Sequence, residues 1–219
     1  MPNATPRAGA PLDVCIDVSH AQGIIEWDSV AKAGIKVAMV KATQGQGYTD
    51  PRWIDNLAGA IAAGIRVIPY HFINSDSPAA QALNFVQHCE PGKAYALDWE
   101  GHNTLSPADV ERLGAILFAR LGRDPLGYWG IPGASPGTPA TSMITWPRWV
   151  PRYRFGRVVS FPAGSTETVG VDCLFWQYSS NGQVPGIRGS VDRSVAMFGS
   201  VEELLTWCDA PPSQAERAA

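Results

Sequence analysis

A strand-then-helix pattern repeats four times between residues 12 and 121. In each repeat a short apolar run is followed by a segment whose apolar residues recur at helical spacing. Repeats of this kind predict parallel strands that are joined by right-handed crossovers through helices. The pattern therefore restricts the chain to an α/β fold with a parallel sheet. We expect strands at 12–18, 36–43, 65–72 and 95–100, and helices at 24–34, 51–63, 77–89 and 107–121.

The pattern changes after a fifth strand, which is expected at 126–128. Prolines at positions 132, 136, 139 and 147 argue against a regular helix in 130–148. A capping box of Ser200 and Glu203 begins a final helix. About eight strands, of which the first five alternate with helices, predict a modified (β/α) barrel, similar to a TIM barrel. The last three strands are expected at 149–153, 174–178 and 191–197.

One barrel-sized domain accounts for most of the chain. Its 219 residues are 45% apolar and 17% charged, which suffices for a single large core. We expect the barrel at 12–209, a flexible lead-in at 1–11 and a tail or linker stub at 210–219. The net charge of −3 argues against a nucleic-acid partner. No segment approaches the roughly 20 apolar residues that a membrane span needs.

The cysteine and histidine patterns indicate neither a disulfide framework nor a metal site. Cys15, Cys89, Cys173 and Cys208 are widely spaced, form no C-x-x-C pair and lie mostly in apolar runs. We therefore expect reduced core residues, although a single Cys15–Cys173 or Cys89–Cys208 bridge stays compatible with the sequence. With 4 histidines and no His-x-His pair, no metal or other cofactor is expected.

Two carboxylates separated by one residue end the strand at 95–100. Alternate side chains of a strand share a face, so Asp98 and Glu100 should project the same way, with their Cα atoms about 6–7 Å apart. Repulsion between them should raise one pKa, which provides an acid near neutral pH. An isolated D-x-E is more often a solvated strand end, but here it follows an apolar run. In a barrel, Asp17 and Asp192 should converge on the same end, where reacting groups lie.

Eight short motifs occur in a fixed order between residues 13 and 207, and together they resemble glycoside hydrolase family 25, the Chalaropsis-type lysozymes. One motif alone would be weak evidence, whereas eight in order cover nearly the whole chain. The motifs are Ile16-Asp17-Val18-Ser19-His20 with Gln22-Gly23, Trp27 with Ala33-Gly34-Ile35, Lys41-Ala42-Thr43, Tyr70-His71-Phe72, Gln81-Ala82, Leu97-Asp98-Trp99-Glu100, Trp176-Gln177-Tyr178 and Val191-Asp192.

The resemblance implies a (β/α)5(β)3 barrel and an N-acetylmuramidase. Such an enzyme cleaves the β-1,4 bond from N-acetylmuramic acid to N-acetylglucosamine in bacterial peptidoglycan. It implies Glu100 as general acid, Asp98 as its catalytic partner, and Asp17 and Asp192 as two further acidic site positions. We expect a monomer whose partner is the cell wall. Residues 1–11 do not resemble a secretory signal, which favours a phage endolysin or export without a signal peptide.

Three aromatic residues at expected strand ends are candidates for contact with sugar rings: Tyr70, Tyr128 and Trp176. Packing in the core explains such positions nearly as well. His71 is expected to be a hydrogen-bonded structural histidine.

Several positions depart from the family pattern. Glu26 stands where Asp is common before Trp27, and Gln44 stands where Glu often follows Lys-Ala-Thr. Residues 148–153 read Arg-Trp-Val-Pro-Arg-Tyr, where the family is nearer Leu-Trp-x-Ala-x-Tyr. The groove wall that this region contributes should therefore differ.

The residues leave the stereochemistry open between inversion, retention and attack by the substrate's own acetamido group. Two other functions also remain open from sequence: a peptidoglycan-binding barrel without catalysis and a metal-dependent cell-wall amidase. Four retained acids argue against the binding barrel, because like charges would destabilise a groove that only binds.

Overall fold

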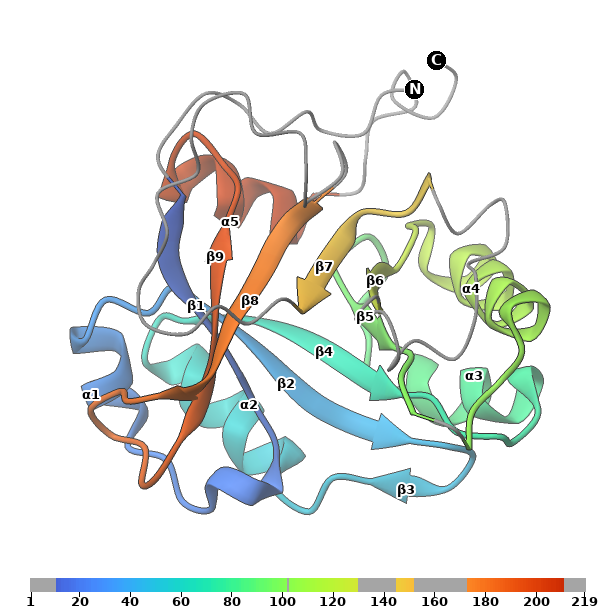
Figure 1. Ribbon diagram of the computed structural model, residues 1–219, viewed down its shortest axis with the longest axis horizontal. Coiled ribbons are helices and arrows are strands. Elements are labelled where there is room, and N and C mark those ends of the chain that lie inside the picture. Colours follow the sequence, from blue (N-terminus) through green and yellow to red (C-terminus); the bar gives the residue numbers. More distant parts are fainter. Residues whose placement is uncertain (1–10, 102, 130–144, 152–172, 211–219) are drawn as a thin grey trace.

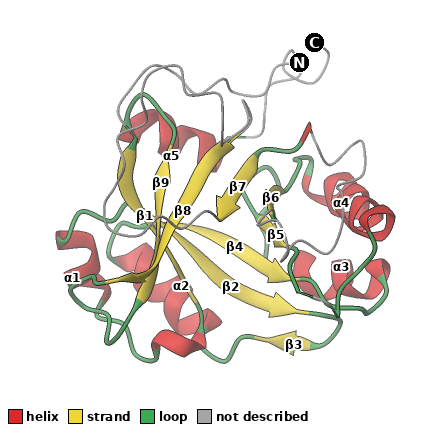
Figure 2. Cartoon of the chain, in the orientation of Figure 1, coloured by secondary structure: helices red, strands yellow, loops and turns green. Residues whose placement is uncertain are grey.

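Eight strands close into a barrel with helices around it in the computed structural model, which describes residues 11–101, 103–129, 145–151 and 173–210 (Figures 1 and 2). Neighbouring barrel strands are parallel along β1, β2, β4, β5, β6, β7 and β8, and β9 lies antiparallel between β8 and β1. Direct pairing of β1 with β2 completes the closure. The expected modified barrel is therefore confirmed. Its strands are β1 (Leu12–Val18), β2 (Val37–Gln44), β4 (Arg66–Phe72), β5 (Ala96–Asp98), β6 (Leu126–Tyr128), β7 (Arg148–Pro151), β8 (Cys173–Gly182) and β9 (Val191–Ala196).

Four helices follow the first four barrel strands and pack on the outside of the barrel. The best-marked helix from sequence, α4, begins and ends where expected. The Ser106 hydroxyl accepts from the Asp109 backbone N–H, and Gly122 ends the helix in the left-handed conformation. The helices are α1 (Trp27–Lys32), α2 (Trp53–Ala62), α3 (Pro78–Val86), α4 (Pro107–Leu121) and the C-terminal α5 (Val201–Asp209).

Two short elements were not expected from the sequence. A 3-10 turn, η1 (His20–Gln22), follows β1, and β3 (Tyr48–Thr49) forms a hairpin with the end of β2. Residues 130–144 lie outside the described residues, as do 1–10, 102, 152–172 and 211–219. The expected absence of a helix in 130–148 and the expected lead-in and tail therefore stay predictions.

Side chains that alternate along the strands fill two separate cores. The outward-facing residues of β1, β2, β4 and β5 pack against α1–α4, with Trp27, Trp53 and Leu113 among the helix residues. The outer face of β8 forms a smaller cluster with residues of β7 and β9. The inward-facing residues of the strands fill the barrel interior, where Met39 and Phe175 are fully buried. Alternation of this kind is what a closed parallel barrel imposes.

Helix α5 closes the amino-terminal end of the barrel. Its Leu204 and Cys208 pack into the interior core, and Arg66, the first residue of β4, pairs with Asp209. Arg123 is 3% exposed, donates to the carbonyl oxygens of Cys208 and Ala210, and stacks on a Trp ring of the same helix. With this end filled, the opposite end, at the carboxyl ends of the parallel strands, is the accessible mouth of the barrel. No helix in the described part of the chain is long and apolar enough to cross a membrane.

The four cysteines are free, as expected. Burial raises the pKa of Cys173 and of Cys208 to about 12, and a buried thiol is a poor nucleophile. The native protein should therefore react slowly with Ellman's reagent, whereas unfolding without reductant should release four reactive thiols. Fewer than four thiols after unfolding would show that a disulfide forms.

Candidate active site

The four predicted acids converge at the mouth of the barrel. Asp17 lies near the end of β1, Asp98 is the last residue of β5, and Glu100 follows two residues later. Asp192 is the second residue of β9 and is paired in register with Asp17. Because β9 runs antiparallel, its beginning lies where the parallel strands end. Strands far apart in sequence thus bring four carboxyl groups into one electrostatic unit.

Trp99 fixes the direction of the two neighbouring carboxylates. Its side chain is fully buried on the helix side of β5, and its indole N–H donates to the Leu105 carbonyl oxygen at 3.0 Å. Asp98 and Glu100, one residue to either side, therefore face the mouth, as the alternation predicted. The strand itself is shorter than expected, since it ends at Asp98 and leaves Glu100 in the following turn.

Asp98 is deeply buried and only partly satisfied. Its side chain is 7% exposed, and its Oδ1 atom has no hydrogen-bond partner within the described part of the chain. Buried carboxylate oxygens are nearly always hydrogen-bonded. Oδ1 is therefore an acceptor without a donor among the described residues, covered by its surroundings at the base of the mouth.

Burial raises the pKa of both Asp98 and Glu100. The pKa of Asp98 rises further because its carboxyl is more deeply buried and is repelled by Glu100. For Glu100, repulsion by Asp192 adds to burial. The Lys41 ammonium on β2, two strands away from β5 in the sheet, opposes these shifts. The two carboxyls therefore titrate as a coupled pair, and one of them is kept protonated nearer to neutral pH.

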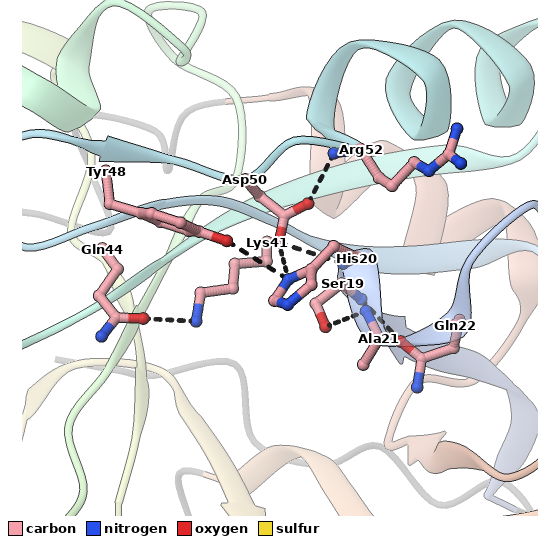
Figure 3. Close-up of polar contacts among 9 residues, drawn as sticks. All are labelled: Ser19, His20, Ala21, Gln22, Lys41, Gln44, Tyr48, Asp50 and Arg52. Carbon is pink, nitrogen blue, oxygen red and sulfur yellow. Dashed lines mark hydrogen bonds and ion pairs between the residues drawn. The ribbon is translucent and has the colours of Figure 1, made fainter.

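Lys41 is held at the rim of the mouth beside a polar cluster (Figure 3). Its Nζ donates to Gln44 Oε1 at 2.8 Å and lies 4.6 Å from the centre of the Phe72 ring. In the same cluster His20 Nδ1 lies 2.8 Å from Oδ2 of the buried Asp50 and 3.4 Å from the hydroxyl oxygen of Tyr48. Gln44 thus binds Lys41 without cancelling its charge.

Tyr70 and Tyr128 lie inside the barrel, next to the acids. Both are nearly buried, and both pack edge-on against Trp149, with ring centres 6.2 and 4.6 Å apart respectively. Burial and four surrounding carboxylates, Asp17 first among them, raise the pKa of Tyr70 well above its usual value.

Trp176, in contrast, is not brought to the acids. It packs on the other face of β8 with Cys173 and Val195. The strand's alternation explains this position, because the next residue, Gln177, points inward.

Gln177 is a site residue that the sequence candidates missed. Its Nε2 donates to Asp17 Oδ2 at 2.8 Å, and its Oε1 accepts from the Tyr128 hydroxyl at 2.9 Å. It lies within the recognised Trp-Gln-Tyr motif, but the sequence gives no sign of which of the three faces inward.

His71 is structural, as expected. Its Nδ1 lies 2.7 Å from Thr43 Oγ1 and its Nε2 lies 3.0 Å from Gln81 Oε1. Burial lowers its pKa to about 4, so it is neutral at physiological pH. Among the described residues, no group of three or more His, Cys, Asp or Glu is arranged to hold a metal ion.

Residues 16–187 match the model of glycosyl hydrolases family 25. The chain belongs to this family. This family 25 chain is 33% identical to lysozyme M1 of Streptomyces globisporus, over 87% of the chain and 69% of that protein. The bacterial lysozyme from Streptomyces coelicolor superposes with a TM-score of 0.70 at 29% identity, covering 93% of this chain and 98% of that one.

The catalytic domain of endolysin ply40 from Listeria phage P40 shares the fold, with a TM-score of 0.68 at 18% identity over 90% of this chain and 97% of that one. Family membership and the lysozyme relatives make the family 25 chain a glycoside hydrolase of the lysozyme type, a muramidase that acts on peptidoglycan.

Replacing Asp98 by Asn should stabilise the protein at neutral pH. A carboxyl whose pKa is raised by folding keeps a proton that the unfolded chain releases. Its contribution to stability is therefore complete below about pH 4 and is lost as the pH rises. We expect the Tm at pH 7 to increase by about 3–6 °C for each unit of the raised pKa, and the two proteins to converge below about pH 4.

Scanning calorimetry across this pH range measures the effect. Asp28→Asn is the matched control, because Asp28 is exposed on α1 and its replacement should change the Tm little. A lower Tm for Asp98→Asn at pH 7 would show that the folded site favours the charged carboxylate.

Proposed function

We propose that Glu100 is the general acid and Asp98 its partner in cleavage of the β-1,4 bond from N-acetylmuramic acid to N-acetylglucosamine. The proposal is supported above all by the pairing of a half-buried Glu100 with a buried Asp98 whose Oδ1 is unpaired among the described residues. Glu100 can donate a proton at the surface of the mouth, and Asp98 can accept a hydrogen bond deeper in the site.

In the first step Glu100 protonates the glycosidic oxygen as the C1–O bond breaks. The N-acetylglucosamine end leaves as an alcohol, and positive charge develops on C1 and the ring oxygen of the muramic acid. A general acid with its pKa raised toward neutral retains its proton at working pH and still donates it readily. Burial and the charge of Asp192 provide that shift for Glu100.

Asp98 acts on the other side of the reacting carbon. Its carboxylate keeps a small exposed edge at the mouth, which is suited to accept the N–H of the 2-acetamido group. This contact orients the acetamido oxygen for attack on C1, as in substrate-assisted glycosidases. An N–H donor favours the ionised form of Asp98, whereas a bound sugar removes water from Glu100 and favours its protonated form. Substrate binding therefore places the shared proton on Glu100, where the reaction needs it.

Other residues shape the site without exchanging the reacting proton. The buried rings of Tyr70 and Tyr128 form an aromatic floor beneath the acids, against which the muramyl ring can rest. The Asp17–Asp192 pair supplies negative charge that stabilises the developing cation. Trp176 packs on the outer face of β8 and has no part in this proposal.

The products should carry muramic acid at the new reducing end. Borohydride reduction of fragments from purified cell wall should then yield muramicitol by mass spectrometry, and proton NMR should show the first-formed anomer with its β configuration retained. Glucosaminitol would indicate the other glycosidic bond, and free peptides without new reducing ends would indicate an amidase. Activity that survives EDTA would separate this reaction from a metal-dependent one.

Glu100→Gln should lower kcat by roughly 10²- to 10⁴-fold, the usual worth of a general acid. Glutamine keeps the size of the side chain, so binding of cell-wall fragments should persist. The wild-type pH profile should be bell-shaped, and its alkaline limb should disappear in the variant because that limb reports the donated proton.

Glu202→Gln provides the matched control, since Glu202 is exposed on α5 at the closed end of the barrel. Its rate and pH profile should match the wild type. If Glu100→Gln keeps the alkaline limb, the proton comes from another acid, and Asp192 becomes the next candidate.

A further inference from the structure

A buried polar chain runs across the barrel behind the two acids of the proposed reaction. It links Tyr128 on β6 to Gln177 on β8 and then to Asp17 on β1, through hydrogen bonds of 2.9 and 2.8 Å. Gln177 is 2% exposed and Asp17 is 8% exposed. A buried polar network of this kind strongly restrains the orientation of each member.

The two hydrogen bonds fix the orientation of the Gln177 amide. The Tyr128 hydroxyl donates to Oε1, so the amide Nε2–H is directed to Asp17. Asp17 therefore receives a hydrogen bond on Oδ2 and has its second oxygen left for Asp192, which lies directly opposite in the register of β1 and β9. The two carboxyl groups form a hydrogen bond with each other.

When two carboxyl groups are in hydrogen-bond contact, the state with one shared proton is much more stable than the state in which both are ionised. Asp17 is the more deeply buried of the two, and burial and the charge of Asp192 raise its pKa well above the usual value. The hydrogen bond from Asp17 opposes the rise that burial causes in the pKa of Asp192. The proton therefore resides on Asp17, and the negative charge resides on Asp192.

We propose that Gln177 is a positioning residue that holds Asp17 and Asp192 as a proton-sharing pair with a single negative charge on Asp192, directed at Glu100. Its amide donor stabilises the singly ionised pair and keeps Asp17 turned toward Asp192. The consequence for catalysis rests on the proposed function, because the charge of Asp192 helps Glu100 retain its proton. The shared proton itself is a property of the folded protein and does not depend on that function.

Other charged and titratable groups around the pair come from several strands and would perturb its titration. Lys41 on β2 favours ionisation of the neighbouring acids, while the carboxylate of Asp98 on β5 disfavours that of Asp17. Burial and the surrounding carboxylates keep Tyr70 on β4 neutral, and Tyr128 on β6 donates its hydroxyl to Gln177. The groups that must be compared in any titration are Lys41, Tyr70, Asp98, Glu100 and Tyr128.

Carbon-13 NMR of the intact protein, labelled at the aspartate carboxyl carbons, tests the proposal without any activity assay. In the wild type, Asp17 should stay protonated at neutral pH while Asp192 ionises. Gln177→Met removes the amide donor at nearly constant volume, so the first ionisation of the pair should move to higher pH by about one unit. Independent titration of both aspartates near pH 4, or an unchanged first ionisation in Gln177→Met, would overturn the proposal.

Gln81→Met is the matched control. Gln81 is also a fully buried, hydrogen-bonded glutamine, but it binds His71 in the helix layer. This variant should lose stability without shifting the aspartate titration. Tyr128→Phe is a milder second variant, because it removes only the hydroxyl that orients Gln177, and its shift should have the same sign as that of Gln177→Met. It keeps the proposal testable if Gln177→Met does not fold.

Kinetics then separate this inference from the proposed function. The acidic limb of kcat/KM on cell wall should move to higher pH in Gln177→Met and stay in place in Gln81→Met. An unchanged limb in both would overturn the role of Gln177 in catalysis. A wild type without muramidase activity would refute the proposed function, while the NMR titration would still decide whether the proton is shared.

Discussion

The site depends on one strand that runs against the others. Because β9 enters the barrel antiparallel between β8 and β1, its first residues lie at the mouth and place Asp192 opposite Asp17. Parallel strands deliver their chemistry at their carboxyl ends, so a parallel β9 would have carried this acid to the end that α5 fills. Because β9 also joins β8 to β1 and so closes the barrel, the strand pairing that closes the fold also assembles the acid cluster.

The cluster opposes folding in a way that the rest of the barrel compensates. Carboxyl groups buried together in the mouth raise one another's pKa values, which creates the acid that hydrolysis needs and also makes the ionised site costly. Aromatic packing of Tyr128 against Trp149 and the hydrogen bonds of Gln177 support the cluster from below. Lys41 supplies positive charge from the rim and forms no ion pair with another described residue.

Much of the fold was predictable because the strand and helix periods are strong. The bounds of α4 and β6 and the convergence of the acids follow from periodicity and from barrel geometry alone. Trp176 was a candidate for sugar contact and Gln177 was not, although Gln177 faces inward and Trp176 packs on the other face of β8. The sequence could not show this, since β8 is buried on both faces and has no apolar–polar alternation. The two-residue β3 was missed because so short a strand has no period. The domain bounds and the catalytic roles stay predictions.

Helix α5, which closes one end of the barrel, also determines where a further domain could be attached. Arg123 anchors the backbone of Cys208 and Ala210 beneath the strands, on the far side of the molecule from the acids. A segment joined to the chain after this anchor is attached at the closed end of the barrel, opposite the acids. A fused tag or a wall-targeting module would therefore be tethered at the closed end of the barrel and not at its mouth. Such a module could hold the enzyme against a surface while the mouth remains open to the glycan strand.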